Sequence, residues 1–291
     1  MRFSPQDLHG PSDLSVICAR IKGFARQLPA PMLGAVSAAV ILISPTPAFS
    51  QNAAATIEAT ADALGMVRTV ARRMDSINAV QFSATGGMRV PQSGGGWTSY
   101  DVTNARIGMS YYIPAMRWDM TRTEANGSER RTIEVVRENR TWDEQEPGVN
   151  PVPVTGQTAE RLRQIWLTPH GIIRAAVDAE AANPGSVTVG SEGGRTTLSV
   201  TVNGTPMTTV LDANNRPERV TMMIDHPVLG RTALTASYSG YLDWQILDVY
   251  FPSRIVQTLD DETSLDLTVT EFFQNPYIVF PTPEQLARSS Q

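Results

Sequence analysis

Residues 265–270, Leu-Asp-Leu-Thr-Val-Thr, decide the fold class of this chain because apolar and polar side chains alternate strictly along them. Successive side chains of a β-strand point to opposite faces, so the stretch places Leu265, Leu267 and Val269 on one face. Such alternation is typical of an antiparallel sheet with one buried face and one wet face. We therefore expect this stretch to be a strand of such a sheet.

The same period of two recurs along most of the chain. It is found at 80–85, 116–121, 132–135, 197–202, 220–225 and 234–238. The pairs Asn126-Gly127, Asn203-Gly204, Asn214-Asn215 and Asp260-Asp261 are turn signals between strands. The pair Gly86-Gly87, directly after the first of these stretches, predicts a bend or bulge.

Two segments have apolar residues at helical spacing instead. One carries a stripe at Ile57, Ala61, Leu64, Val67, Ala71 and Met74. The other begins near Thr158, a candidate N-cap, and has Leu162, Ile165 and Trp166 on its apolar face. Pro169 should interrupt it, and helix should resume over 172–182 before the stop at 183–185.

The apolar face of the sheet must be covered, and the helices are the available covers. The sequence therefore predicts an α+β protein with a curved antiparallel β-sheet, an incomplete barrel. An N-terminal helix and an inserted helical segment should cover its concave face.

The first fifty residues have the charge order of a secretory signal. Basic residues precede an apolar run at 32–43 that is too short to span a bilayer, and Ala48-Phe49-Ser50 supplies small residues for a signal peptidase. We expect residues 1–50 to be a signal peptide of the general secretory route. Residues 51–291 should then form one β-rich half-barrel domain with an irregular C-terminal tail, periplasmic or secreted, with no stable membrane span after cleavage.

Composition excludes several kinds of chemistry. Cys18 is the only cysteine and Lys22 the only lysine, and both lie in the predicted signal. Disulfides, cysteine-ligated metals, thiolate catalysis and Schiff-base chemistry are therefore not expected of the processed chain. The formal net charge of −5 argues against a nucleic-acid partner.

Histidines and carboxylates offer the remaining candidates for a site. Only His170 and His226 are left as imidazole ligands, and a turn histidine bonded to local backbone is the simpler interpretation of each. Acidic residues gather at Glu134, Glu138, Asp143 and Glu144, where paired carboxylates would suit glycoside hydrolysis. Charged residues on the wet face of a strand are the ordinary explanation. We expect no metal, no cofactor and no catalytic residue.

Aromatic and methionine side chains are the candidates for a binding surface. The chain has 5 tryptophans and 11 methionines. Most should lie in the core, but the same residues would also line an apolar cavity. We take Trp118, Met120, Trp166 and Met222 as the candidate ligand-binding residues.

The order of elements resembles that of a known family. An opening helix, a meander of strands and an inserted helix precede residues 250–256, Tyr-Phe-Pro-Ser-Arg-Ile-Val, and the closing stretch at 265–270. This order resembles the periplasmic lipoprotein carriers of the Lol family. The resemblance implies an incomplete barrel over a helical lid, and hence a non-catalytic periplasmic binding module for an apolar or lipid-like ligand.

A second resemblance implies a different role. Four stretches carry it: Met-Asp-Ser-Ile at 74–77, Gln-Ile-Trp-Leu-Thr-Pro-His-Gly at 164–171, His-Pro-Val-Leu-Gly at 226–230 and Tyr-Ser-Gly-Tyr at 238–241. They are similar to the N-terminal, non-catalytic region of secreted metallo-β-lactamase-fold hydrolases. No His-x-His-x-Asp-His motif occurs in this chain, so the resemblance transfers no catalytic residue. The alternative function is an accessory or relic domain whose hydrolase partner is separately encoded.

Overall fold

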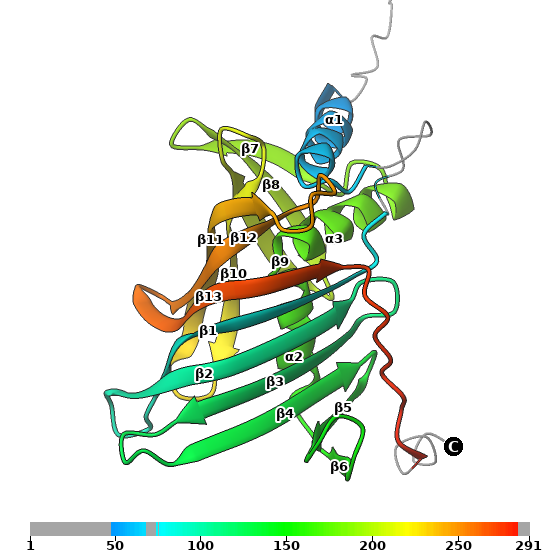
Figure 1. Cartoon of the computed structure of the whole chain (residues 1–291). Helices are drawn as coiled ribbons and strands as arrows, with labels where there is room; N and C mark the ends of the chain where they lie inside the picture. The colour runs from blue at the N-terminus through cyan, green and yellow to red at the C-terminus, as the bar shows by residue number, and fades with distance from the viewer. Residues whose placement is uncertain (1–47, 68–73, 75, 285–291) are drawn as a thin grey trace, which may run out of the picture. The chain divides into compact units, whose positions relative to one another are not determined.

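A computed structural model describes residues 48–67, 74 and 76–284 of the chain (Figure 1). Its helices are α1 (Ala48–Ala63), α2 (Thr158–Trp166) and α3 (Pro169–Ala182). Its strands are β1 (Ala79–Pro91), β2 (Trp97–Ser110), β3 (Ala115–Thr123), β4 (Glu129–Arg137), β5 (Arg140–Glu144), β6 (Val152–Pro153), β7 (Thr188–Glu192), β8 (Arg195–Val202), β9 (Thr205–Leu211), β10 (Pro217–His226), β11 (Gly230–Asp243), β12 (Tyr250–Leu259) and β13 (Glu262–Gln274).

These strands form one antiparallel sheet of 13 strands within the described residues, in the order β6-β5-β4-β3-β2-β1-β13-β12-β11-β10-β9-β8-β7. Strands β1 and β13, the first and last in the sequence, pair with each other at the centre of the sheet. In this pair Val80 lies opposite Gln274 and Met88 opposite Leu265. The sheet is curled and does not close, and its two edges are β6 and β7 (Figure 1). The predicted α+β class with a curved, unclosed antiparallel sheet is therefore confirmed.

The predicted irregularity at Gly86-Gly87 is also present. The register of β1 shifts against β2 between Ala84 and Gly86, and against β13 between Ser83 and Ala84. A Cβ atom on Gly86 would lie 1.9 Å from the carbonyl oxygen of Asp266. The glycine is therefore required by the close approach of two backbones at the centre of the sheet.

Helix α1 differs from its prediction at both ends. It begins at Ala48, within the predicted signal peptide, whose residues 1–47 lie outside the described part of the chain. It ends at Ala63 rather than near Met74 because Gly65 adopts a φ of 77°. The Met66 amide donates to the Ala61 carbonyl at 2.8 Å, which closes a Schellman motif at this end. Beyond the end of the helix, the side chains of Leu64, a member of the predicted stripe, and of Met66 are buried in the core.

The inserted helical segment forms as two helices, α2 and α3. Gln157, and not Thr158, occupies the N-cap position of α2, and its side chain makes no capping hydrogen bond. Pro169 does not simply interrupt a helix, because it is the first residue of α3. Thr168 caps α3, since its side chain accepts a hydrogen bond from the Gly171 amide at 3.1 Å. Pro169 follows as the first helical residue, a position that proline favours.

Two tyrosines hold the corner between α2 and α3. The Tyr111 hydroxyl, just after β2, lies 2.8 Å from Oγ1 of Thr168. The Tyr238 hydroxyl, on β11, donates to the carbonyl oxygen of Leu167. Burial raises the pKa of both phenols, so they remain neutral donors at any ordinary pH. The corner is therefore bonded to strands on both sides of the central β1-β13 pair.

The main buried cluster joins one face of the sheet, called here the inner face, to the helices. It includes Phe82, Ile107, Met116, Val220, Met222, Phe251 and Leu267 from strands and Ile165, Trp166, Ile172 and Ile173 from helices. Trp166 is only 7% exposed, which confirms its predicted burial. None of the described helices is both long enough and apolar enough to cross a bilayer.

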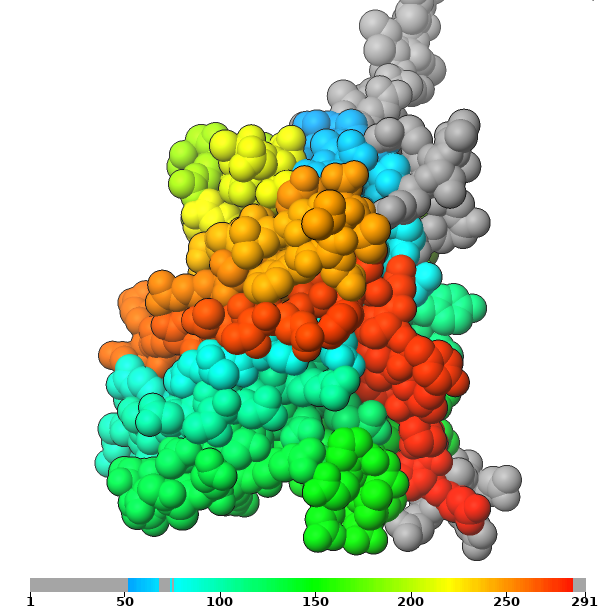
Figure 2. Space-filling model, in the orientation of Figure 1, coloured from blue at the N-terminus to red at the C-terminus, as the bar shows by residue number. Residues whose placement is uncertain are grey.

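The opposite, outer face is not simply wet, which corrects the expectation. A second buried cluster forms there from Ala115, Ile133, Val135, Trp142 and Phe280. Phe280 belongs to the irregular tail at 275–284. Its carbonyl oxygen accepts a hydrogen bond from Nη1 of Arg137 at 2.7 Å. In Figure 2 the red tail lies against the strands coloured cyan to green. The predicted irregular tail is therefore a cover for the outer face of β3 to β5.

Candidate functional site

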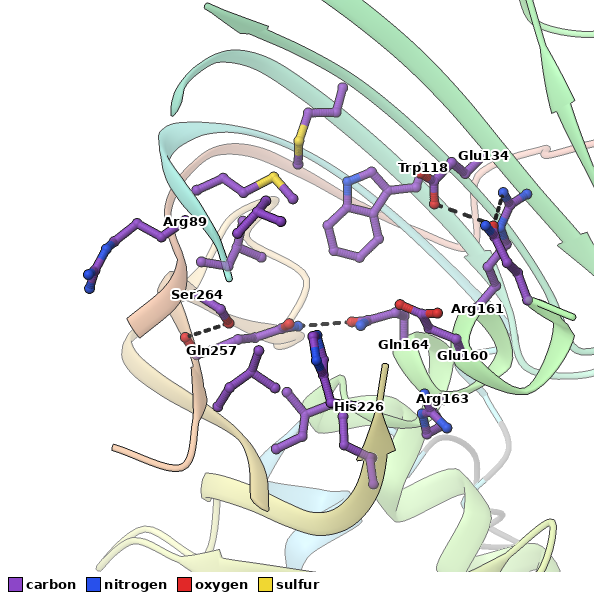
Figure 3. A pocket seen from close by; sticks show the side chains of 18 of the residues that line it. Arg89, Trp118, Glu134, Glu160, Arg161, Arg163, Gln164, His226, Gln257 and Ser264 are labelled. Atoms are coloured by element: carbon purple, nitrogen blue, oxygen red, sulfur yellow. Dashed lines mark hydrogen bonds and ion pairs between the residues drawn. The ribbon is translucent and has the colours of Figure 1, made fainter. Parts of the chain in front are cut away.

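A first cavity, with a volume of about 310 Å³, lies between α2 and the inner face of the sheet (Figure 3). Its apolar wall is built from β1, β3, β10, β11, β12 and β13. The wall consists of Met88, Val90, Pro91, Met116, Trp118, Met120, Ile224, Leu234, Leu259 and Leu265. Methionines and a tryptophan adapt their shape to an apolar ligand, and the volume is in the range of small-ligand sites.

The same cavity has a polar wall. Its charged and polar residues are Arg89, Arg122, Thr132, Glu134, Gln157, Glu160, Arg161, Arg163, Gln164, His226, Gln257 and Ser264. Four of these are arginines and two are glutamates, so the wall carries more positive than negative side chains. The cavity is therefore amphipathic, with an apolar side and a cationic side.

Arg161 attaches α2 to the sheet and is only 3% exposed. Its Nη1 donates to the carbonyl oxygens of Val135 at 3.0 Å and Trp142 at 2.8 Å. Its Nη2 donates to Oδ1 of Asp143 and to Oε1 of Gln157, both at 2.6 Å. A buried arginine with so many partners positions the helix against β4 and β5.

Glu134 lies on β4 where the expected alternation is inverted. Ile133 and Val135 face the outer cluster, whereas Glu134 lines the cavity on the inner face. Its Oε2 lies 3.7 Å from Nε of Arg161. Desolvation in the cavity raises the pKa of Glu134, and Arg161 partly offsets this effect.

Of the neighbouring carboxylates, Glu138 is largely exposed, as the ordinary explanation expects, whereas Glu144 and Asp143 are bonded to arginines. Glu144 is buried and accepts from Nε of Arg117 at 2.9 Å and from Nε1 of Trp142 at 2.8 Å. These bonds hold the pKa of Glu144 below its usual value against the opposing effect of desolvation. Asp143 is the partner of Arg161 described above. These acidic residues therefore order the β4-β5 region.

One hydrogen bond crosses the first cavity. Gln257 of β12 and Gln164 of α2 point toward each other in Figure 3, and Nε2 of Gln257 donates to Oε1 of Gln164 at 2.9 Å. Arg161 holds the same helix toward β4 and β5. Helix α2 is thus fastened by an extensively bonded arginine on one side and by this amide pair on the other.

A second cavity, of about 450 Å³, lies on another side of α2. It is lined by Pro114, Glu138, Thr158, Ala159, Leu162, Arg163, Trp166, Val202, Asn203, Thr205 and Met207. Arg163 is the residue that both cavities share. Helix α2 therefore separates two spaces and has a cation between them.

The four residues predicted to bind a ligand fall in three places. Trp118 and Met120 are brought together in the first cavity. Trp166 lines the second cavity. Met222 lies in the packed part of the main cluster and lines neither space. The alternation of β10 placed Met222 on the inner face, but periodicity does not say where packing leaves a space.

The two histidines have different environments. His226 is a turn histidine as predicted, because its Nδ1 accepts from the amides of Val228 and Leu229 at 3.1 and 3.2 Å. His170 is instead fully buried, and its ring stacks 5.9 Å from that of Phe251. Burial lowers the pKa of His170 to about 4, an effect that the Leu64 backbone partly offsets. Among the residues the structure describes, no three His, Cys, Asp or Glu side chains group as metal ligands.

Comparison with known proteins adds no assignment. No protein-family model matches the chain, and no curated protein matches it. The two cavities and the residues of α2 are therefore the features that bear on function. Arg161 and Arg163 are the site residues that sequence reasoning missed, although Arg161 precedes Ile165 by four positions and so shares its helix face.

Proposed function

We propose that this protein is a non-catalytic periplasmic binding module for an apolar or lipid-like ligand. In this proposal α2 and α3 cover the concave face of the curled sheet, and the ligand occupies the space beneath α2. The observation that carries the proposal is the first cavity itself, in which Trp118 and Met120 form part of an apolar wall. Protein interiors are otherwise close-packed, so an open apolar space beside a helix favours a ligand.

The attachment of α2 supports the same function. A ligand of appreciable length must pass the helix that borders the cavity. The Gln164–Gln257 bond is a neutral hydrogen bond, whose net contribution is only about 1 kcal/mol. We propose that α2 moves away from β12 while Arg161 keeps it attached to β4 and β5.

Two measurements test this function. Lipids extracted from the purified protein and identified by mass spectrometry should include a stoichiometric apolar molecule. Titration with Nile red, a neutral apolar dye, should show saturable binding that Trp118→Ala weakens by about tenfold, or about 1.4 kcal/mol.

Met120 and Met222 provide a matched control. Both are buried methionines of the inner face, but only Met120 lines the cavity. Met120→Ala should change dye binding, whereas Met222→Ala should lower the free energy of unfolding by about 2 to 5 kcal/mol and leave the dye affinity of the folded protein unchanged. A wild-type protein that yields no lipid and binds no dye would rule out the proposed function.

A further inference from the structure

The arginines of the first cavity differ in what they bind. Nη1 of Arg89 pairs with Oε2 of Glu262 at 3.0 Å. Arg161 donates to two backbone carbonyl oxygens and also to the side chains of Asp143 and Gln157. Arg122 is bonded less well, since its Nη1 contacts only the Sδ of Met88 at 3.9 Å and its guanidinium lies 4.9 Å from the Tyr100 ring.

Arg163 is the exception among them. Within the described residues its guanidinium makes no hydrogen bond, and no carboxylate lies within 4.0 Å of it. Its Nε is buried and has no partner. Its two terminal nitrogens are not buried in this way, so they are accessible to a ligand. Glu160 and Asp225 act on it only through longer-range attraction.

An unpartnered guanidinium in this position is costly to the folded protein. Desolvation lowers the pKa of Arg163, but arginine stays charged at any ordinary pH. The buried Nε has lost its contact with water and has no hydrogen-bond partner in exchange, which is unfavourable for the folded protein. Its planar fork of N–H donors suits a carboxylate or a phosphate, which can accept two parallel hydrogen bonds.

The position of Arg163 connects this charge to the apolar wall. The residue lines both cavities, and one of them contains Trp118 and Met120. In Figure 3 its side chain lies on the α2 side of the first cavity, apart from the Glu134–Arg161 pair. A molecule with its chain along the apolar wall would have its end near Arg163.

We infer that the ligand is an anionic amphiphile, with an apolar chain in the first cavity and a carboxylate or phosphate head bound by Arg163. This inference rests on the proposed function and adds the charge of the ligand to it. Arg122 contributes a second positive charge on the same wall. Arg89 is paired with Glu262 and Arg161 with Asp143, and Glu134 lies 3.7 Å from Arg161. Arg122 and Arg163 are therefore the cavity arginines without a carboxylate within 4.0 Å among the described residues, and they favour an anionic head.

The test compares three probes on the purified protein by displacement of Nile red and by calorimetry. Oleate has an apolar chain and a carboxylate, oleyl alcohol has the same chain without charge, and butyrate has the charge almost without the chain. Wild-type protein should bind oleate at least about tenfold more tightly than oleyl alcohol, as one charge-assisted hydrogen-bonded pair predicts. Butyrate should not displace the dye.

Arg163→Gln should remove the preference for oleate and leave the binding of oleyl alcohol unchanged. Arg163→Lys keeps the charge and should retain part of the preference, which separates recognition from a loss of folding. Arg254→Gln is the matched control, because Arg254 lines neither cavity and its guanidinium already has Asp266 as a partner. It should leave the preference intact.

The outcomes separate the two proposals. Equal affinity of wild-type protein for oleate and oleyl alcohol overturns the anionic head and leaves the apolar site standing. A preference that survives in Arg163→Gln overturns Arg163 as the residue that binds the head. Binding of butyrate as tight as that of oleate overturns the amphiphile and indicates a site for a free small anion. Failure of every probe, including Nile red, overturns the proposed function itself.

Discussion

Gln257 of β12 donates a hydrogen bond to Gln164 of α2 across the first cavity, over 2.9 Å. The two residues are 93 positions apart in the sequence, so this bond joins elements that are brought together only by the complete fold. It is the polar contact that a moving α2 must break on the β12 side.

Removal of this bond should loosen α2 without unfolding the protein. In a double-mutant cycle of Gln164→Ala and Gln257→Ala, we expect a coupling free energy of about 0.5 to 1.5 kcal/mol. Amide hydrogen exchange over 158–166 should become faster in each variant, while exchange in β12 stays slow. A coupling energy near zero would show that the amide pair does not fasten the helix.

Arg161→Met should lower the free energy of unfolding by about 3 to 5 kcal/mol, measured by urea denaturation. The change leaves Asp143, Gln157 and two carbonyl oxygens without their donor, and these include buried groups. The same change at Arg254, whose pair with Asp266 is largely exposed, is the control and should leave the free energy of unfolding almost unchanged. Equal losses at the two positions would contradict the role given to Arg161.

His170 should make the protein less stable in mild acid. Its pKa in the folded protein is lowered to about 4 from an ordinary 6.5, so between these values the unfolded chain binds a proton that the folded protein does not. Its contribution to stability is therefore lost as the pH falls through this window, by about 3 kcal/mol in total. His170→Phe, which keeps a ring beside those of Phe251 and Phe272, should remove this part of the pH dependence.

The measurement is the difference in unfolding free energy between wild type and His170→Phe at several values of pH. That difference should be constant above about pH 7 and shift in favour of the variant down to about pH 4. Carboxylates with lowered pKa values, such as Glu144, affect both proteins equally and cancel. A difference that does not change with pH would be inconsistent with a neutral buried imidazole.

The tail should stabilise the outer face through Phe280. Phe280→Ala removes a buried ring that packs with Trp142 and should cost about 3 kcal/mol. Tyr277→Ala is a matched aromatic change three positions earlier in the same tail, where the side chain is 95% exposed, and should cost less than about 0.5 kcal/mol. If both variants unfold at the wild-type denaturant concentration, the tail does not contribute to the fold.

The alternation of apolar residues was sufficient to predict the strands and the sheet class, because a period of two is a local property. It was not sufficient to say which face is inside. Ile133 and Val135 alternate with Thr132 and Glu134 as expected, but the apolar pair faces the tail. This burial is provided by Phe280 of the tail. The hydrogen bond between the tail and Arg137 joins residues 143 positions apart, so a local pattern could not reveal it.

The end of α1 and the site itself were missed for different reasons. Gly65 is a recognisable helix stop, but the apolar stripe of the sequence continues past it through Val67, Ala71 and Met74, so the periodicity predicted a longer helix. Trp118 and Met120 could be predicted as ligand-binding residues because they are a tryptophan and a methionine on the apolar face of a strand. The cationic wall was not, because arginine on a half-buried helix is usually solvated and its pairing is decided by distant strands.

The pairing of β1 with β13 has a consequence for how the chain folds. The Asn78 amide donates to Oδ1 of Asn275 at 2.7 Å, across 197 residues of sequence. The central pair of the sheet therefore closes the longest loop of the domain, and the closure entropy must be met before the contacts are gained. The strands β1 to β6 and β7 to β12 can each form early from local hairpins. Neither group is joined to the other until β13 pairs with β1. Refolding should accordingly take about milliseconds to seconds or longer, and a ribosome-bound chain without β13 should expose β1 as an unpaired, aggregation-prone edge.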